Sequence, residues 1–249
     1  MIFLKSPEEI EKMSKAGRIV AEVLDAIKGI IQAGITTKEV ENFAEERVIA
    51  LGGKSAFKGY KGYPASICTS INEQVVHGIP SSYKLKDGDI ISIDLGVYYA
   101  GFYGDGAVTI PVGKLDDQTA NLLRVTEESL YLGIENAIVG NRVSDISYPI
   151  QKHVEKNGFS VVRSFVGHGI GRELHEEPQV PNYGTPGNGP RLREGMTLAI
   201  EPMVNAGAFE VKVLEDGWTA ITSDGKRSAH FEHTVLITLD KPRILTKYK

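Results

Sequence analysis

The chain has 249 residues, of which 41% are apolar, so it can bury a core as one large domain or two small ones. Its net charge of -4 and the lack of a dense Lys/Arg run argue against nucleic-acid specificity. The single cysteine, Cys68, excludes an internal disulfide, and the opening residues MIFLKSPEEIEK hold neither a signal peptide's apolar stretch nor a membrane span. We therefore expect a cytoplasmic protein without a membrane contact.

Two helices are predicted at the N-terminal end. Ser6 to Glu9 (SPEE) combines an N-cap, a proline at the first helical position and a capping-box glutamate. Apolar residues then recur at three-and-four spacing from Ile10 to Ile27, and we expect this helix to continue until Gly34 stops it. A second helix is expected from about Thr37 to Leu51, closed by Gly52.

A similar unit follows later in the chain. The segments DDQTANLLRVTEESLYLGIENAIVG and SDISYPIQKHVEKNG predict two more helices. LKDGDIISID (Leu85 to Asp94) aligns with LREGMTLAIE (Leu192 to Glu201) at a shift of 192 − 85 = 107, and both copies end in a carboxylate. The glycines that stop the helices are displaced by 106 positions: Gly34 and Gly140, Gly52 and Gly158.

The matched shifts favour a duplicated unit over a chance likeness of helix and strand patterns. We predict a single α+β domain, residues 1–249, built from two halves at about 6–113 and 114–249. A pseudo-two-fold axis would relate the halves, each with two helices before its strands. No linker rich in Pro, Gly or Ser separates them.

Four carboxylates are associated with predicted strands. Asp94 alternates with the isoleucines of IISIDLG, so it faces away from them, and Glu201 holds the matching place in the other copy. After each strand the chain returns, bringing Asp105 in YGDGAVTI and Glu232 in HFEHTVLIT. If both pairs form hairpins, the pseudo-two-fold axis brings the four carboxylates together.

Such a cluster needs a positive partner, because like charges raise one another's pKa. Two divalent cations roughly 3.5–4 Å apart are a common solution with carboxylates and a histidine. Taken singly, each acid fits a solvated strand edge, and Asp105 between two glycines fits a turn. Taken together, with Asp94 and Glu201 at equivalent places, the four favour a metal site.

The histidines are less decisive. VVHGIP and VGHGIG place His77 and His168 after apolar runs, where a hydrogen-bonded core histidine and a ligand are both reasonable. His175 follows His168 by seven residues, and glycines between them exclude the helical motif of zinc proteases. We interpret His153 and His233 as structural and leave His230 undecided.

Several long motifs resemble one family, the type I methionine aminopeptidases. They are GYKGYPASICTSINEQVVHGIP, IDLGVYYAGFYGDGAVT, GHGIGRELHEEPQVPNYG, LREGMTLAIEPM and HFEHTVLIT, and the similarity extends over nearly the whole chain. The resemblance implies a pita-bread fold with two pseudo-symmetric halves around two divalent metal ions, which would be Co, Mn, Fe or Zn.

The resemblance also implies roles for individual residues. The metal ligands would be Asp94, Asp105, His168, Glu201 and Glu232, with Asp105 and Glu232 bridging the ions. His77 and His175 would contact substrate. The pocket for a methionine side chain would be formed by Tyr60, Tyr63, Cys68, His77 and Trp218. A monovalent cation would lie at backbone oxygens near Asn72, Gln74 and Ser228.

Two positions depart from the family pattern. Many bacterial members have a cysteine where this chain has Phe57 and a phenylalanine where it has Leu174. Both places line or flank the methionine pocket, so we expect an altered pocket shape and an unaltered metal site. The chain otherwise looks like the short bacterial form.

The implied activity is removal of the initiator methionine from nascent proteins and peptides, with a small residue following it. In this mechanism a hydroxide bridging the metal ions attacks the scissile carbonyl. Glu201 would relay the water's proton to the leaving amine, and His77 and His175 would donate hydrogen bonds to the carbonyl oxygen. The implied partners are nascent chains and, transiently, the ribosome; the protein would be a monomer.

Two other functions fit parts of the same pattern. An aminopeptidase P or prolidase would share the metal ligands but usually carries an extra N-terminal domain, for which this chain has no room. A metal-free binding protein on the same fold would have lost several ligand positions, and all five are present here.

Overall fold

The computed structural model describes residues 1–247, and its helices begin at caps supplied by the sequence. Helix α1 begins after Ser6, which accepts the Glu9 N–H while the Glu9 carboxylate accepts the Ser6 N–H. Thr36 and Glu39 form the same capping box at α2. The helices within the described range are α1 (Pro7–Lys28), α2 (Thr37–Ala50), α3 (Asp117–Glu135) and α4 (Val143–Lys156), with a short 3-10 turn, η1 (Tyr60–Gly62).

The prediction that the first helix runs to Gly34 is wrong. Helix α1 ends at Lys28, and Gly29 caps it. Ile31 still packs against the core, but from the irregular segment after the helix, so the apolar residues continue beyond the end of the helix itself. Gly34 lies in a turn of this segment at φ +94°, and its N–H donates to the Leu85 carbonyl oxygen, which joins the turn to the segment before the sheet.

One large sheet contains most of the strands. Among residues 1–247 its order is β1-β4-β5-β14-β9-β7-β8, with β2 paired to β4 and β15 paired to β14. Its strands are β1 (Lys54–Ser55), β2 (Cys68–Ile71), β4 (Ile90–Tyr99), β5 (Phe102–Pro111), β7 (Gly167–Gly169), β8 (Glu176–Val180), β9 (Thr197–Ile200), β14 (Glu232–Leu236) and β15 (Arg243–Ile244).

Two small sheets complete the strand pairing of the described chain. The first has the order β13-β10-β6 and the second β11-β12-β3. Their strands are β3 (Gln74–Val76), β6 (Ser160–Val161), β10 (Met203–Asn205), β11 (Val211–Val213), β12 (Ala220–Thr222) and β13 (Ser228–His230).

Only one of the two expected hairpins forms. Strands β4 and β5 are joined by a tight turn and pair antiparallel over their whole length, with Asp94 opposite Ala107. Strands β9 and β14 also pair antiparallel, but β10 to β13 lie between them in sequence, so this second hairpin prediction is wrong. The two carboxylates of that pair still become neighbours, because strand pairing depends on the final sheet rather than on a short connection.

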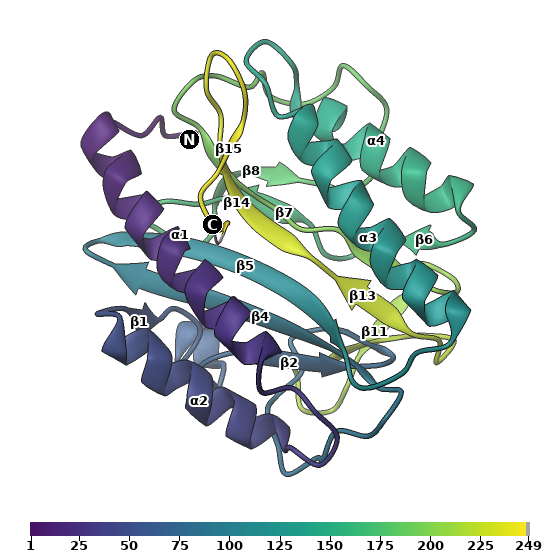
Figure 1. Cartoon of the computed structure of the whole chain (residues 1–249). Coiled ribbons are helices and arrows are strands. Elements are labelled where there is room, and N and C mark those ends of the chain that lie inside the picture. The colour runs from purple at the N-terminus through teal and green to yellow at the C-terminus, as the bar shows by residue number, and fades with distance from the viewer. Residues whose placement is uncertain (248–249) are drawn as a thin grey trace.

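The helices cover one face of the sheet in two groups (Figure 1). Helices α1 and α2 share a core with β4 and β5, and α3 and α4 share another with β9 and β14. The matched glycines before β4 and β9, Gly88 and Gly195, have φ of +87° and +83°. The division into pseudo-symmetric halves stays a prediction. No helix within residues 1–247 is both long and apolar enough to cross a membrane.

Helix α1 approaches the sheet and the C-terminal segment closely at Gly17. A Cβ added there would lie 2.5 Å from the Leu245 carbonyl oxygen, and a Cβ on Gly104 of β5 would lie 2.8 Å from the Gly17 nitrogen. These backbones therefore pack together only because neither position carries a side chain.

Replacing Gly17 with alanine should lower the free energy of unfolding by about 1–3 kcal/mol through overpacking. Helix propensity alone favours alanine over glycine by about 1 kcal/mol, so the two effects have opposite signs. Urea denaturation measures the difference, with exposed Lys15→Ala on the same helix as the control. A Gly17→Ala protein that is more stable than the parent, by the amount that helix propensity alone gives, would contradict the close approach.

Candidate active site

A cavity of about 250 Å³ is lined by all the residues that the sequence proposes for binding divalent metal and substrate. Asp94 reaches it because the alternating residues Ile91 and Ile93 pack on the helix side of β4. The predicted residues that line the cavity are Tyr60, Tyr63, Cys68, His77, Asp94, Asp105, His168, His175, Glu201, Trp218 and Glu232. Asn72, Gln74 and Ser228 are not part of its lining.

The carboxylates come from adjacent strands of the large sheet. Asp94 lies on β4, Asp105 on β5 and Glu232 at the start of β14, while Glu201 directly follows β9. Potential ligand atoms of Asp105, His168 and Glu232 lie within 4.8 Å of one another. Glu201 joins this group through an oxygen 3.4 Å from Nε2 of His168.

Burial makes these carboxyl groups weaker acids than usual. It raises the pKa of Asp94 to about 6, and His230 offsets part of that rise. Burial first, and then nearby carboxylates, raise the pKa of Asp105 and Glu201 well above the ordinary range. The pKa of Glu232 is raised in the same way, by burial and by Asp94. The free-energy cost of ionising this cluster is what a bound cation would remove.

The donor set fits divalent metal ions. Oδ1 of Asp94 and Oε1 of Glu232 are buried without a hydrogen-bond partner, as expected of ligand atoms. Nδ1 of His168 lies 2.8 Å from the Gly169 carbonyl oxygen, so it carries the proton and leaves the Nε2 lone pair directed at the carboxylates. Burial lowers the pKa of His168 to about 4, which keeps the imidazole neutral as a ligand must be.

A second wall of the cavity is aromatic. The rings of Tyr63 and Trp218 meet edge to face at 5.1 Å between centroids, and His77 meets Phe165 at 5.4 Å. Nδ1 of His175 lies 2.9 Å from the Tyr60 hydroxyl. Burial, aided by His230, lowers the pKa of His77 to about 4, so its imidazole is neutral.

His175 lies between the two walls. Its ring centroid is 4.2 Å from that of His168 and 5.3 Å from that of Tyr60. Burial and then the neighbouring His168 lower the pKa of His175 to about 3. The two histidines are seven residues apart in the sequence, and the structure brings their rings together.

Some lining residues were missed from the sequence. Phe57 and Leu174, the departures from the family pattern, do line the cavity. The missed residues are Lys61, Val76, Phe165, Val166 and Met203. Phe165 and Val166 lead into the strand of His168, and Met203 follows Glu201 by two residues, so proximity to a proposed ligand was the only available signal.

The chain is similar to proteins of one known family over most of its length. The sequence profile described as Metallopeptidase family M24 matches residues 11–239. The chain belongs to this family. It is 56% identical to a methionine aminopeptidase of Clostridium perfringens, over 100% of both chains. It is 55% identical to methionine aminopeptidase 1 of Bacillus subtilis, over 99% of this chain and 100% of that one.

Solved structures confirm the predicted pita-bread fold. The crystal structure of a methionine aminopeptidase from Thermotoga maritima has a TM-score of 0.98 and 54% identity, with 100% of both chains covered. A prolidase from Pyrococcus furiosus has a TM-score of 0.80 and 25% identity, with 99% of this chain and 66% of that one covered. As an M24 member the protein is a metallopeptidase, a hydrolase that uses divalent metal ions.

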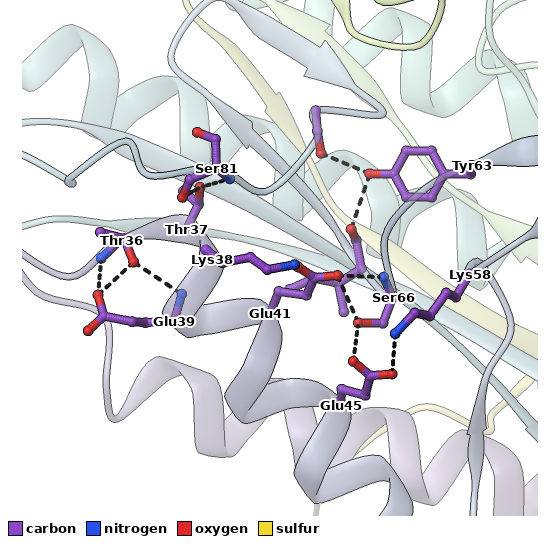
Figure 2. Close-up of polar contacts among 12 residues, drawn as sticks. Thr36, Thr37, Lys38, Glu39, Glu41, Glu45, Lys58, Tyr63, Ser66 and Ser81 are labelled. Atoms are coloured by element: carbon purple, nitrogen blue, oxygen red, sulfur yellow. Dashed lines mark hydrogen bonds and ion pairs between the residues drawn. The ribbon is translucent and has the colours of Figure 1, made fainter.

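Helix α2 holds the loop that carries Tyr63 of the aromatic wall (Figure 2). The buried Glu41 carboxylate accepts the Ser66 N–H at 2.9 Å and pairs with Lys38. Burial alone would raise the pKa of Glu41, but the hydrogen bonds from Lys38 and Ser66 outweigh it and lower the pKa. The Tyr63 hydroxyl shares its one proton between the carbonyl oxygens of Ile67 and Gly78, at 3.1 and 3.0 Å, and so joins this loop to the segment of His77.

A buried ion pair holds the segment that carries His175. Glu176, the next residue, pairs with Nζ of Lys5 at 2.5 Å, and each side chain is only 4% exposed. Its other oxygen accepts the N–H groups of Arg172 and Glu173. The conspicuous Glu176 is therefore an anchor between the N-terminal segment and the active-site loop.

Replacing Lys5 with methionine should lower the free energy of unfolding by about 3–5 kcal/mol, because Glu176 would stay buried without its counter-charge. The control is Arg172→Met, which removes a pair between exposed Arg172 and Glu9 and should cost less than about 1 kcal/mol. Thermal and urea denaturation of both variants measure the contrast. Equal effects would show that burial of the Lys5 pair does not matter.

Proposed function

We propose that this M24 peptidase is a methionine aminopeptidase that removes the initiator methionine from nascent proteins and peptides when a small residue follows. The observation that carries the proposal is one cavity lined both by a carboxylate and histidine cluster and by a wall of aromatic side chains. That wall suits an unbranched, apolar side chain such as that of methionine. The similarity to named methionine aminopeptidases over the full chain supports it.

Two divalent ions are proposed to bind within the cluster. Their ligands would be Asp94, Asp105, His168, Glu201 and Glu232. Bound there, the ions would make hydroxide available near neutral pH and polarise the scissile carbonyl. An oxygen-rich set with imidazole suits Mn, Fe, Co or Zn.

The protein's own groups move the protons. Glu201 takes a proton from the attacking water and delivers it to the leaving amine. His77 and His175 donate hydrogen bonds to the carbonyl oxygen as negative charge develops on it. If the Tyr60 hydroxyl donates to Nδ1 of His175, the proton of the neutral ring is on Nε2 and is available to the substrate.

Other features of the resemblance stay predictions. A monovalent cation is proposed at backbone oxygens near Asn72, Gln74 and Ser228, where the Ser228 N–H donates to the Asn72 carbonyl oxygen and Asn72 has φ of +54°. A small residue after methionine, a cytoplasmic location, a monomeric state and transient contact with the ribosome are further expectations of the same proposal.

Replacing Glu201 with alanine should lower kcat on Met-Ala-Ser by about 100- to 10,000-fold, because the substitution removes the proposed proton carrier. Release of methionine measures the loss, and circular dichroism checks the fold. The exposed Glu46→Ala on α2 is the control and should keep full activity. An active Glu201→Ala enzyme would contradict the assignment.

The same assay separates the prolidase alternative. The parent protein should hydrolyse Met-Ala-Ser and leave Xaa-Pro dipeptides intact. Faster hydrolysis of the Xaa-Pro substrates would favour a prolidase activity over the proposed aminopeptidase activity.

Metal binding should stabilise the fold in a pH-dependent way. Because the folded protein raises the Asp94 pKa from 3.8 to about 6, the metal-free fold favours protonated Asp94. That contribution to stability is present below the unfolded value and is lost as pH rises through about 6. Bound metal removes this loss, and metal at about 100 times its Kd adds about 2.7 kcal/mol.

We therefore expect chelation near neutral pH to lower Tm and metal affinity to fall as pH falls through about 6, where protons compete for the ligands. Differential scanning calorimetry measures the first effect. Calorimetric titration with Mn²⁺ or Co²⁺, in buffers of different ionisation enthalpy, measures the second as released protons. An affinity that does not change with pH would contradict the raised carboxyl pKa values.

A further inference from the structure

His230 is a buried histidine for which the proposed mechanism has no role. It ends β13, two residues before Glu232, and is 1% exposed. Its backbone is fixed, because the Thr109 hydroxyl donates to the His230 carbonyl oxygen and accepts its N–H. Both ring nitrogens, by contrast, lack a hydrogen-bond partner. A buried polar group of this kind requires an explanation.

The imidazole ring faces the carboxylate cluster. Ligand atoms of Asp94, His230 and Glu232 all lie within 4.8 Å of one another. Nε2 of His230 is 3.8 Å from Oε2 of Glu232, which is too long for a hydrogen bond. Oδ1 of Asp94 and Oε1 of Glu232 are also without partners. Three residues with ligand chemistry thus surround one point, and each has at least one unpartnered atom.

We propose that His230 is a further ligand in the metal centre, binding the ion held by Asp94 and Glu232. The inference rests on the proposed two-metal function and adds a residue that the family resemblance did not assign. Glu232 would then lie between two ligand groups, each with its own imidazole. His168 supplies the imidazole on the Asp105 side, and His230 supplies it on the Asp94 side.

A second imidazole should alter which metals the centre prefers. Carboxylate and water ligands suit Mn²⁺, whereas imidazole suits Co²⁺ and Zn²⁺ better. Replacing His230 with glutamine keeps the side chain polar and removes the imidazole. We expect His230→Gln to weaken Co²⁺ and Zn²⁺ binding about 10-fold or more, and to weaken Mn²⁺ binding less.

Affinity alone does not separate a ligand from a group that orients one, because loss of an orienting partner also costs about 10- to 100-fold. The deciding measurement is proton NMR of the protein loaded with Co²⁺ at both sites. An imidazole bound to Co²⁺ gives a strongly shifted, solvent-exchangeable N–H resonance. The parent should show two such resonances, one from His168 and one from His230, and His230→Gln should show one.

The control is His153→Gln, which changes a half-buried histidine on α4 that contacts Glu128. It should keep both resonances and the parent's metal affinities. The metal-free variants are compared by circular dichroism, and the parent spectrum tests the proposal even if a variant does not fold. A single shifted resonance in the fully loaded parent, or two in His230→Gln, would overturn the assignment.

These outcomes are independent of the proposed activity. Two shifted resonances in a protein that releases no methionine would sustain the His230 assignment and reject the aminopeptidase function. One resonance in a protein that does release methionine would reject the assignment and leave the aminopeptidase function in place.

Discussion

Electrostatic repulsion among four buried carboxyl groups is the constraint on which the rest of this structure depends. The sheet forces them together, because their strands β4, β5, β14 and β9 are consecutive neighbours. Thr234 reinforces this arrangement, since its hydroxyl donates to the Asp105 carbonyl oxygen and accepts the Asp105 N–H across the strand boundary. The paired backbone thus keeps the carboxyl groups close, and their repulsion must be relieved by bound protons or metal ions.

The two walls of the cavity are positioned by different means. The carboxylates lie on or directly beside paired strands, whose register fixes their spacing. The aromatic wall comes mainly from loops, which have no such register and depend on side chains behind them. Glu41 holds the loop of Tyr63, and Glu176 holds the loop of His175. The charges of Glu41 and Glu176 are already balanced by Lys38 and Lys5. The acids in the cavity have no such lysine partner among the described ion pairs.

The sequence revealed those parts of the site that have a local period or cap. The orientation of Asp94 follows from strand alternation, and the start of α1 follows from its capping box. The end of α1 was missed because Ile31 continues the apolar spacing from the irregular segment after the helix. The long connection from β9 to β14 was missed because no local pattern marks which strands will pair. Phe165 was missed because cavity walls made by loops have no period.

The pair between Lys5 and Glu176 also bears on the order in which the molecule can assemble. The two residues are 171 positions apart, and the neighbouring contact of Glu9 with Arg172 spans 163. During synthesis Lys5 emerges early, and its partner follows only after most of the chain. Contacts of such separation form late, because a long loop must close first. The loop of His175 on the substrate side of the cavity is therefore fixed only when the N-terminal segment has met the segment around Glu176.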